Sequence, residues 1–370
     1  MQIDISVFIS CYNQGEYIAQ AIESVLNQKT DYSFEVIIGD DFSSDNSREI
    51  IMDYYKRYPD KIKLMMHPKN IGLVQNFLAF IDMANGEFAS FCEGDDYWTN
   101  IDKLQDQISF LVKNPSYTIA YGKIDGLFVK ENIIKKDIYN LDSVNIKSGD
   151  LTLLISRKYF MHTSTIFTRT CLLREFQNLM INKFYRMKTW DYAYMVYACI
   201  KGPIKYLDKS YAIQRFNKKS YTGRQQGYKK FRFFVQDTSN PIMYLLRKMN
   251  ANPTLQLSYK NSYSRQVLLY GIELDDNKLI KRGMSLLKKY EYNKDFPRSI
   301  IGIFIDFGFV NKNINFMNMG LEIAIQNKIQ IEFYRRIKFW IIKSNFLLNL
   351  YHLSKNRITN IKFIRKKLNY

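Results

Sequence analysis

Four short apolar segments alternate with amphipathic segments over the first hundred residues, and this order restricts the fold more than any other feature of the chain. The apolar segments have the length of buried strands and read ISVFIS (5–10), FEVIIG (34–39), IKLMM (62–66) and FASFC (88–92). The stretches between them have helical spacing, as in residues 18–26, where the apolar side chains share one face. The alternation predicts an α/β fold, in which helices cover both faces of a mostly parallel sheet.

Polar segments directly follow three of the four predicted strands. They are CYN (11–13), DDFSSD (40–45) and EGDD (93–96). In sheets of this kind, ligands bind at the carboxyl ends of the strands. We therefore expect the three polar segments to meet at one edge of the sheet and to form the functional site.

The segment EGDD has two interpretations. Its acids can begin and cap a helix after a turn, which is a common structural role for carboxylates. Alternatively, Asp95 and Asp96 bind Mg²⁺ or Mn²⁺, because these ions prefer oxygen ligands and typically take one or two carboxylates together with substrate phosphates. Gly94 would let the backbone approach such a ligand closely.

The segment DDFSSD also has two interpretations. Ser44, Asp45 or Ser47 can cap the following helix, but this role leaves the adjacent Asp40 and Asp41 unexplained. A carboxylate at a strand end can instead accept a hydrogen bond from the N–H of a nucleobase. The chain contains neither GxGxxG after the first strand nor GxxxxGK[ST] anywhere, which argues against dinucleotide-binding and P-loop sites.

The charge of the chain is concentrated in its C-terminal part. The formal net charge is +19; residues 1–225 contribute 28 basic against 26 acidic residues, and residues 226–370 contribute 26 against 9. Strand signals also fade after about residue 226, where helical segments such as 331–351 carry Lys and Arg on their polar faces. We therefore predict a catalytic domain over 1–225 and a basic helical domain over 226–370.

A basic helical domain suits an anionic partner, either a membrane surface or nucleic acid. Because no RNP-like or zinc-finger pattern occurs, we expect no nucleic-acid binding. A peripheral membrane contact fits the basic amphipathic segments, and a domain with an ordinary solvated basic face fits them equally. No segment is long and apolar enough to span a bilayer.

Cysteine and histidine content limits the compartment and the metal chemistry. The four cysteines lie far apart without CxxC spacing, which indicates reduced thiols, and the first residues are strand-like with no signal peptide. The chain has three histidines, none within helical reach of another, which argues against a zinc site built on histidine. We expect a cytoplasmic protein.

Four longer segments together resemble the inverting family 2 glycosyltransferases of the GT-A fold. They are SVFISCYNQGEYIAQAIESVLNQ (6–28), FEVIIGDDFSSDNS (34–47), NIGLVQNF (70–77) and NGEFASFCEGDDYW (85–98). The resemblance covers about residues 3–110 strongly and 111–220 more loosely. It implies a GT-A catalytic domain, a Rossmann-like mostly parallel sheet flanked by helices, followed here by an all-helical C-terminal domain.

The resemblance also implies roles for residues of the three polar loops. Ser10 and Tyr12 would surround the base and ribose of the donor, and Asp41 would accept a hydrogen bond from a uracil-type N–H. Asp95 and Asp96 would form the DxD-type site for Mn²⁺ or Mg²⁺ and the diphosphate. Glu93 stands where the family often has aspartate, and we expect it to support the site without binding the metal.

A second departure from the family, and two residues on the acceptor side, complete the expected site. Asn217 stands near the position where many members carry a metal- or diphosphate-binding histidine, so phosphate contacts would fall to Arg215, Lys218 or Arg224. An inverting transfer needs a base for the acceptor hydroxyl, and Asp191 opens a helix in a stretch poor in acids. At the N-cap of that helix Asp191 would have a structural role, whereas the resemblance favours its role as the general base. His162 either lines the acceptor cleft or is a core histidine.

The expected function is metal-dependent, inverting transfer of a sugar from a nucleotide-diphospho sugar, with UDP as the nucleotide. The acceptor would be a hydroxyl of a saccharide or of a lipid-linked acceptor, in bacterial surface-polysaccharide or glycolipid synthesis at the inner face of the cell membrane. One alternative is a GT-A-like sugar nucleotidyltransferase, but CYNQGEY (11–17) lacks the Arg or Lys of its activating loop. The other is a non-catalytic nucleic-acid-binding protein. Sugar, linkage and oligomeric state are left open.

Overall fold

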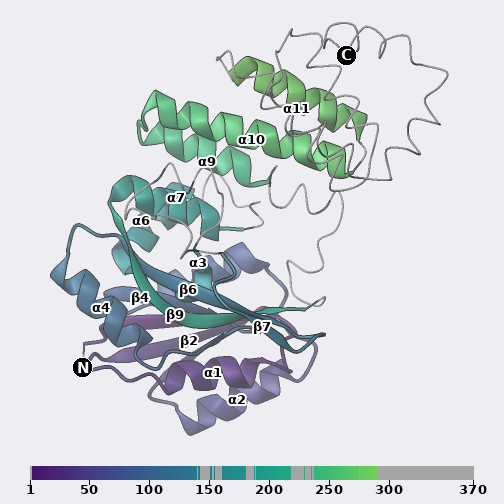
Figure 1. Ribbon diagram of the computed structural model, residues 1–370. Helices are drawn as coiled ribbons and strands as arrows, with labels where there is room; N and C mark the ends of the chain where they lie inside the picture. Colours follow the sequence, from purple (N-terminus) through teal and green to yellow (C-terminus); the bar gives the residue numbers. More distant parts are fainter. Residues whose placement is uncertain are drawn as a thin grey trace, which may run out of the picture. The chain divides into compact units, whose positions relative to one another are not determined.

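A computed structural model describes much of the N-terminal three quarters of the chain (Figure 1). The described residues are 2–139, 141, 151, 154, 161–180, 187, 189–217, 229, 235, 237–274 and 276–290. The chain divides into two compact units, Met1–Tyr290 and Glu291–Tyr370, and every described residue lies in the first. The predicted helical segment at 331–351 therefore lies outside the described residues.

The described strands form a single sheet in the order β3-β2-β1-β4-β8-β6-β9-β5, with β7 paired to β6. Their bounds are β1 Ile5–Cys11, β2 Phe34–Asp40, β3 Ile62–Met66, β4 Phe88–Glu93, β5 Tyr97–Trp98, β6 Ile119–Phe128, β7 Ile133–Lys135, β8 Phe167–Arg169 and β9 Ile204–Phe216. The first four strands are parallel, as predicted. Beyond β4 the sheet is mixed: β8, β5 and β7 pair antiparallel, and β9 runs parallel to β6.

Two layers of helices bury the two faces of the sheet. Successive side chains of β1 point to opposite faces, so that Val7 and Ile9 pack into one core and Phe8 into the other. Helices α1 (Ile18–Leu26), α2 (Ser47–Arg57) and α4 (Lys103–Lys113) cover the first face; α3 (Leu73–Met83), α6 (Thr170–Met180) and α7 (Asp191–Lys201) cover the second (Figure 1). Burial on both faces explains why these strands are continuously apolar.

The central part of the chain contains short elements that local sequence patterns do not reveal. A 3₁₀ turn, η2 (Thr163–Thr165), precedes the three-residue strand β8. Helix α6 and the strands β5, β7 and β9 were not predicted. Strands of two or three residues are too short to show a hydrophobic period of their own, since they form by pairing with strands elsewhere in the chain.

A buried lysine links α4 to the strand that leads into the acidic loop. Lys103 Nζ donates hydrogen bonds to Ser90 Oγ (2.6 Å) and Gln107 Oε1 (2.8 Å) and lies 4.1 Å from the centre of the Trp98 ring. Burial holds the pKa of Lys103 well below its usual range. Gln107 in turn donates to the carbonyl of Thr165 (2.7 Å), so this polar network connects α4, β4 and the η2 turn.

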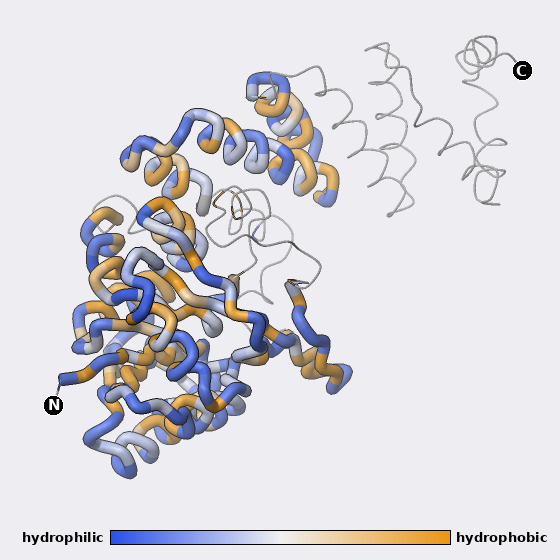
Figure 2. The backbone as a smooth tube through the Cα atoms, turned by 60° about the vertical axis from the view of Figure 1, so that its left-hand side comes forward, coloured by the Kyte–Doolittle hydropathy of each residue, from blue (hydrophilic) through white to orange (hydrophobic). Residues whose placement is uncertain are grey.

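After residue 226 the described residues contain helices and no strand. The helices are α9 (Asp237–Lys248), α10 (Pro253–Glu273) and α11 (Asn277–Tyr290), and hydrophobic and hydrophilic residues alternate along the last two (Figure 2). In α11, Leu279, Ile280 and Leu287 are buried, whereas the basic side chains Lys278, Lys281, Arg282, Lys288 and Lys289 are exposed. Among the residues described, no helix is long and apolar enough to cross a membrane.

Candidate active site

The loops after β1, β2 and β4 lie at one edge of the sheet, as expected from the sequence. Cys11 at the end of β1 is in register with Asp40 at the end of β2, and Ser10 is in register with Glu93 at the end of β4. Because the three strands are parallel neighbours, their carboxyl ends bring CYN, DDFSSD and EGDD together.

The loops after β1 and β2 are joined by hydrogen bonds in which side chains of each loop accept backbone N–H groups of the other. Asn13 N–H donates to Ser43 Oγ (2.8 Å), Ser44 N–H donates to Asn13 Oδ1 (2.7 Å), and Gly15 N–H donates to Asp45 Oδ2 (2.9 Å). The N-cap of α2 is Asn46, without a side-chain cap, so none of Ser44, Asp45 and Ser47 holds the N-cap position. The polar residues of DDFSSD mainly join two loops.

Two aromatic side chains stand exposed at this edge. Tyr12 is 40% exposed and Phe42 is 47% exposed. Phe42 has a φ of +66°, in the left-handed region that a bulky residue rarely adopts. The Arg48 guanidinium lies 5.2 Å from the centre of the Phe42 ring. Tyr12 is thus accessible, as its predicted nucleotide-binding role requires.

The paired aspartates Asp40 and Asp41 have separate partners. Asp40 forms a 2.5 Å ion pair with Arg48. Asp41 is 4% exposed, and its two oxygens accept the backbone N–H groups of Ile71 (2.6 Å) and Gly72 (2.9 Å). Burial raises the pKa of Asp41 above its usual range, although the two hydrogen bonds act to lower it. Its role toward a uracil-type base stays a prediction.

Four carboxylates gather beyond the end of β4. Glu93 accepts a short hydrogen bond from the Ser10 hydroxyl, so Ser10 contacts this cluster. The pKa of Glu93 is raised to about 7, chiefly by burial and also by the charges of Asp95 and Asp191, against the Ser10 bond. Burial likewise holds the pKa of Asp96 well above its usual range, with additions from Asp95 and Glu93. In the ligand-free protein these two carboxyl groups therefore retain their protons to a higher pH than exposed acids do.

Asp191 is the first residue of α7, and the N-cap position belongs to Trp190. The N-cap alternative for Asp191 is therefore wrong. The Trp190 ring stacks on Phe77 of α3 with centroids 3.5 Å apart and planes 2° from parallel, which fixes the start of α7. Asp191 lies near enough to Glu93 for its charge to raise the pKa of that group.

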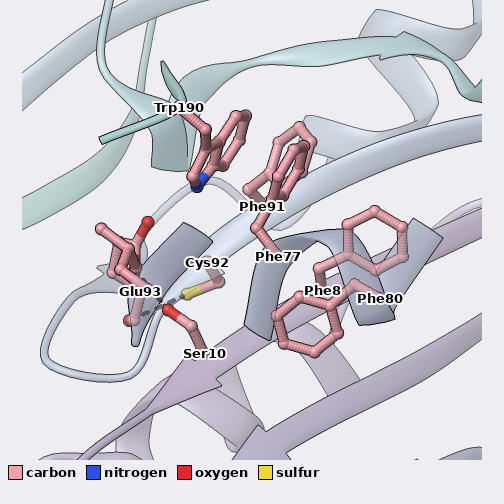
Figure 3. A pocket seen from close by; sticks show the side chains of 9 residues that line it. Phe8, Ser10, Phe77, Phe80, Phe91, Cys92, Glu93 and Trp190 are labelled. Carbon is pink, nitrogen blue, oxygen red and sulfur yellow. Dashed lines mark hydrogen bonds between the residues drawn. The ribbon is translucent and has the colours of Figure 1, made fainter. Parts of the chain in front are cut away.

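A small aromatic pocket adjoins Glu93 (Figure 3). Its lining residues are Phe8, Ser10, Leu73, Phe77, Phe80, Phe91, Cys92, Glu93 and Trp190. Figure 3 shows the Trp190 and Phe77 rings on one side and the Ser10–Glu93 pair at the polar end. The pocket thus places an apolar wall next to the acidic cluster.

Arg215 supports the acidic loop from β9. Its guanidinium donates to the Asp95 carbonyl (2.8 Å) and to Gln20 Oε1, and it lies 4.8 and 4.5 Å from the ring centres of Tyr17 and Tyr97. Arg215 is only 6% exposed, so these contacts hold the 95–97 segment, and a phosphate contact stays a prediction. The two further predicted phosphate contacts, Lys218 and Arg224, lie outside the described residues.

The η2 turn supplies partners for Asp96 that sequence analysis did not identify. Ser164 Oγ donates to Asp96 Oδ2 (3.0 Å), and Arg215 N–H donates to Asp96 Oδ1 (3.1 Å). His162 Nε2 lies 3.8 Å from the same Oδ2, and burial lowers the pKa of His162 to about 4. His162 lies at the site, whereas Ser164, in a stretch of small polar residues, offered no distinguishing signal.

The carboxylate cluster suits a divalent cation chemically. Carboxylate oxygens are the ligands that Mg²⁺ and Mn²⁺ prefer. A bound cation would favour the ionised forms of Glu93 and Asp96, whose pKa values burial raises in the ligand-free protein. In the part of the chain that is described, no group of three or more His, Cys, Asp and Glu side chains is arranged to hold a metal ion. Asp95 and Asp96 would hold such an ion together with substrate phosphates.

Comparisons with known proteins show a family match over part of the chain and a similar fold. Residues 6–176 match the family described as "Glycosyl transferase family 2". WfgD of Escherichia coli, named a UDP-Glc:alpha-D-GlcNAc-diphosphoundecaprenol beta-1,3-glucosyltransferase, is 30% identical over 160 residues, which are 41% of this chain and 60% of WfgD. A Mycobacterium tuberculosis protein is 39% identical over 120 residues, 32% of this chain; the match spans 35% of that relative's length.

The crystal structure of residues 1–349 of Staphylococcus aureus TarS in complex with UDP has a similar fold. The TM-score is 0.57 at 19% sequence identity, with 88% of this chain and 92% of that chain covered. At this identity the likeness concerns the fold alone, and it confirms the predicted GT-A architecture.

Proposed function

We propose that the protein is a metal-dependent inverting glycosyltransferase, since residues 6–176 match the family described as glycosyl transferase family 2. The donor is a nucleotide-diphospho sugar, with UDP as the nucleotide. The name of WfgD and the UDP in the TarS crystal structure support this choice.

The observation that carries the proposal is that Glu93, Asp95 and Asp96 lie at the carboxyl end of β4. The charge of Asp191, at the start of α7, acts on Glu93. A leaving nucleoside diphosphate is anionic, and a bound Mn²⁺ or Mg²⁺ would neutralise its charge there. Asp95 and Asp96 would hold the ion. Ser10 and Tyr12 would contact the base and ribose, and Asp41 would contact the base.

Asp191 is the proposed general base. The acceptor oxygen forms a bond to the anomeric carbon while the bond from that carbon to the diphosphate oxygen breaks, with inversion. The proton of the acceptor hydroxyl passes to the Asp191 carboxylate. The stack of Trp190 on Phe77 (centroids 3.5 Å apart) fixes the start of α7, and with it the base.

The acceptor is proposed to be a saccharide or lipid-linked hydroxyl in surface-polysaccharide or glycolipid synthesis, at the cytoplasmic face of the membrane. Its support is the diphosphoundecaprenol acceptor in the name of WfgD and the exposed basic residues of α11. We divide the chain accordingly into a catalytic domain, 1–225, and an attachment domain, 226–370. Five exposed basic side chains on one 14-residue helix are suited to anionic headgroups.

A transfer assay with a panel of UDP-sugars and Mn²⁺ tests the function. Asp191→Asn should lower kcat by about 10²–10⁴-fold and leave UDP binding unchanged. The matched control is Asp237→Asn, since Asp237 is likewise the first residue of a helix, α9, and it should retain full activity.

Three results would contradict the proposal. They are full activity of Asp191→Asn, activity that persists after removal of all divalent cations, and formation of a nucleotide sugar from sugar phosphate. The last result would instead favour a sugar nucleotidyltransferase.

A further inference from the structure

The β6–β7 hairpin extends from the same edge of the sheet as the candidate active site. Strand β8 runs antiparallel to both β4 and β6, and β9 runs parallel to β6, so β6 and β9 end at the edge where β4 ends. Their last residues, Phe128 and Phe216, are in register, and β7 begins at Ile133 beside them (Figure 1). Arg215, whose backbone N–H donates to Asp96 (3.1 Å), directly precedes Phe216. The hairpin is therefore joined to the acidic loop through β9.

Apolar side chains lie on both faces of this hairpin. On one face Ile133 is opposite Phe128, and the Phe128 ring stacks on Phe216 with centroids 4.8 Å apart and planes 11° from parallel. On the other face Ile134 is opposite Leu127, because successive side chains of a strand point to opposite sides. Ile133 is 51% exposed and Ile134 is 48% exposed. Both faces of β7 are therefore open to solvent at these positions.

Exposed basic side chains border these apolar ones. They are Lys130, Lys135 and Lys136, and Glu131 is the single acid among residues 128–136. Lys136 also forms a 2.7 Å ion pair with Asp125. Lys135 Nζ lies 4.7 Å from the centre of the Phe128 ring. Lysine side chains placed in this way cover apolar surface with their stems and keep their charged ends in water or among lipid headgroups.

We propose that the β6–β7 hairpin inserts Ile133 and Ile134 into the surface of an anionic bilayer and so holds the catalytic edge of the sheet at the membrane. The inference rests on the proposed lipid-linked acceptor, and it gives the catalytic domain a membrane contact of its own. A hydroxyl linked to a lipid lies at the headgroup layer, so an active site that faces this layer meets the acceptor without extracting it.

The exposure of both isoleucines favours lipid over a protein as the partner. A protein seated on the hairpin would cover one face of β7, whereas headgroups and acyl chains surround an inserted hairpin on both faces. The three lysines complement anionic headgroups, at about 1 kcal/mol for each basic residue near the surface. The combination of exposed aliphatic residues and a basic border is typical of segments that lie in the membrane interface.

The test places an environment-sensitive fluorophore on the full chain and adds vesicles of equal parts phosphatidylcholine and phosphatidylglycerol. Cys171 is exposed and the other three cysteines are buried, so Cys171→Ser supplies the background for labelling one introduced cysteine. Labels at Ile133→Cys and at Ile134→Cys should both shift their emission to shorter wavelength and be quenched by spin-labelled lipid. A label at Val112→Cys, a similarly exposed position on α4, should do neither.

Cosedimentation with the same vesicles measures what the hairpin contributes to binding. The double variants Ile133→Ser/Ile134→Ser and Lys130→Gln/Lys135→Gln should each raise the Kd for the vesicles by about tenfold or more. The matched control is Ile101→Ser/Val112→Ser, which removes two similarly exposed aliphatic side chains and should leave the Kd unchanged.

Four results would refute the membrane contact. They are no vesicle binding by the wild type, vesicle binding in which the labels at 133 and 134 do not respond, a response of only one of these labels, and a response without vesicles that grows with protein concentration. The third would indicate a partner on one face of β7, and the fourth a second copy of this chain.

The transfer assay with UDP-sugars separates this inference from the function on which it rests. With soluble saccharide acceptors, Ile133→Ser/Ile134→Ser should retain the kcat of the wild type. If the wild type transfers no sugar, the glycosyltransferase function is refuted, whereas the two labels alone decide the membrane contact.

Discussion

Replacing Glu93 with glutamine should stabilise the protein in the absence of divalent cations. The pKa of Glu93 is raised from 4.5 to about 7, mainly by burial and further by the charges of Asp95 and Asp191. Between these two values the folded protein retains a proton that the unfolded chain has released. The free energy of unfolding therefore falls as the pH rises from about 4.5 to about 7, and the full loss persists above that range.

The size of the effect follows from the two pKa values. A difference between 4.5 and about 7 corresponds to about 3 kcal/mol, at about 1.4 kcal/mol per pH unit. Glutamine resembles the protonated glutamate and does not ionise. At pH 8, Glu93→Gln should thus exceed the wild type in free energy of unfolding by about 3 kcal/mol, and near pH 4 the two proteins should be almost equally stable.

Urea denaturation at pH 4, 6 and 8 in buffers with chelator measures this difference. Glu35→Gln is the control, because Glu35 is equally bonded to a serine of β1 but is paired with Lys63 at 2.7 Å, so its replacement should destabilise the protein. Equal stability of Glu93→Gln and the wild type at pH 8, or an advantage that does not shrink on acidification, would refute the electrostatic reasoning.

Three other substitutions test separate parts of the structure by urea denaturation. Phe42→Gly should raise the free energy of unfolding by about 1 kcal/mol, because it relieves a left-handed conformation at φ +66°; a loss of stability would contradict this. Because the pKa of Lys103 is lowered in the folded protein, folding releases a proton below pH 10.5, and the free energy of unfolding of the wild type should rise between pH 7.5 and 9.5. Lys103→Met removes this group, so the rise should be smaller in the variant. An unchanged pH dependence would refute the reasoning. Trp190→Leu removes the stack on Phe77 and should lower the free energy of unfolding by at least about 1 kcal/mol. It should also lower kcat, because the stack fixes the position of the next residue, the proposed base Asp191. An unchanged kcat would show that the stack does not position the base.

The parallel half of the sheet and its functional edge could be predicted because both depend on local patterns. Strands β1 to β4 are mostly apolar, and three of them are followed at once by polar segments, so their ends are visible in the sequence. The register of Cys11 with Asp40 and of Ser10 with Glu93 then follows from parallel pairing. The GT-A fold was predictable to this extent from about a hundred residues.

The partners of the acidic residues could not be predicted, because they come from distant segments. Ser164 is 68 residues from Asp96, and Arg215 is 119 residues from it. Ser164 lies in the turn directly before the short strand β8, and Arg215 lies in the long strand β9, which pairs with the short strand β5. The pairing of these strands has no signature in the local sequence. The same limitation applies to Asp41, whose oxygens are bound by the backbone of residues 71–72, a contact set by a loop conformation.

The two ends of β1 show why function lies at one of them. At each end a serine of β1 donates to a glutamate of a neighbouring strand: Ser6 to Glu35 and Ser10 to Glu93. Lys63 neutralises Glu35, whereas Glu93 faces the charges of Asp95 and Asp191, which raise its pKa. Burying like charges together is unfavourable unless a ligand supplies the opposite charge. The carboxyl end of the strand therefore keeps an electrostatic cost that a bound cation can relieve, and such a cost persists in a folded protein where binding requires it.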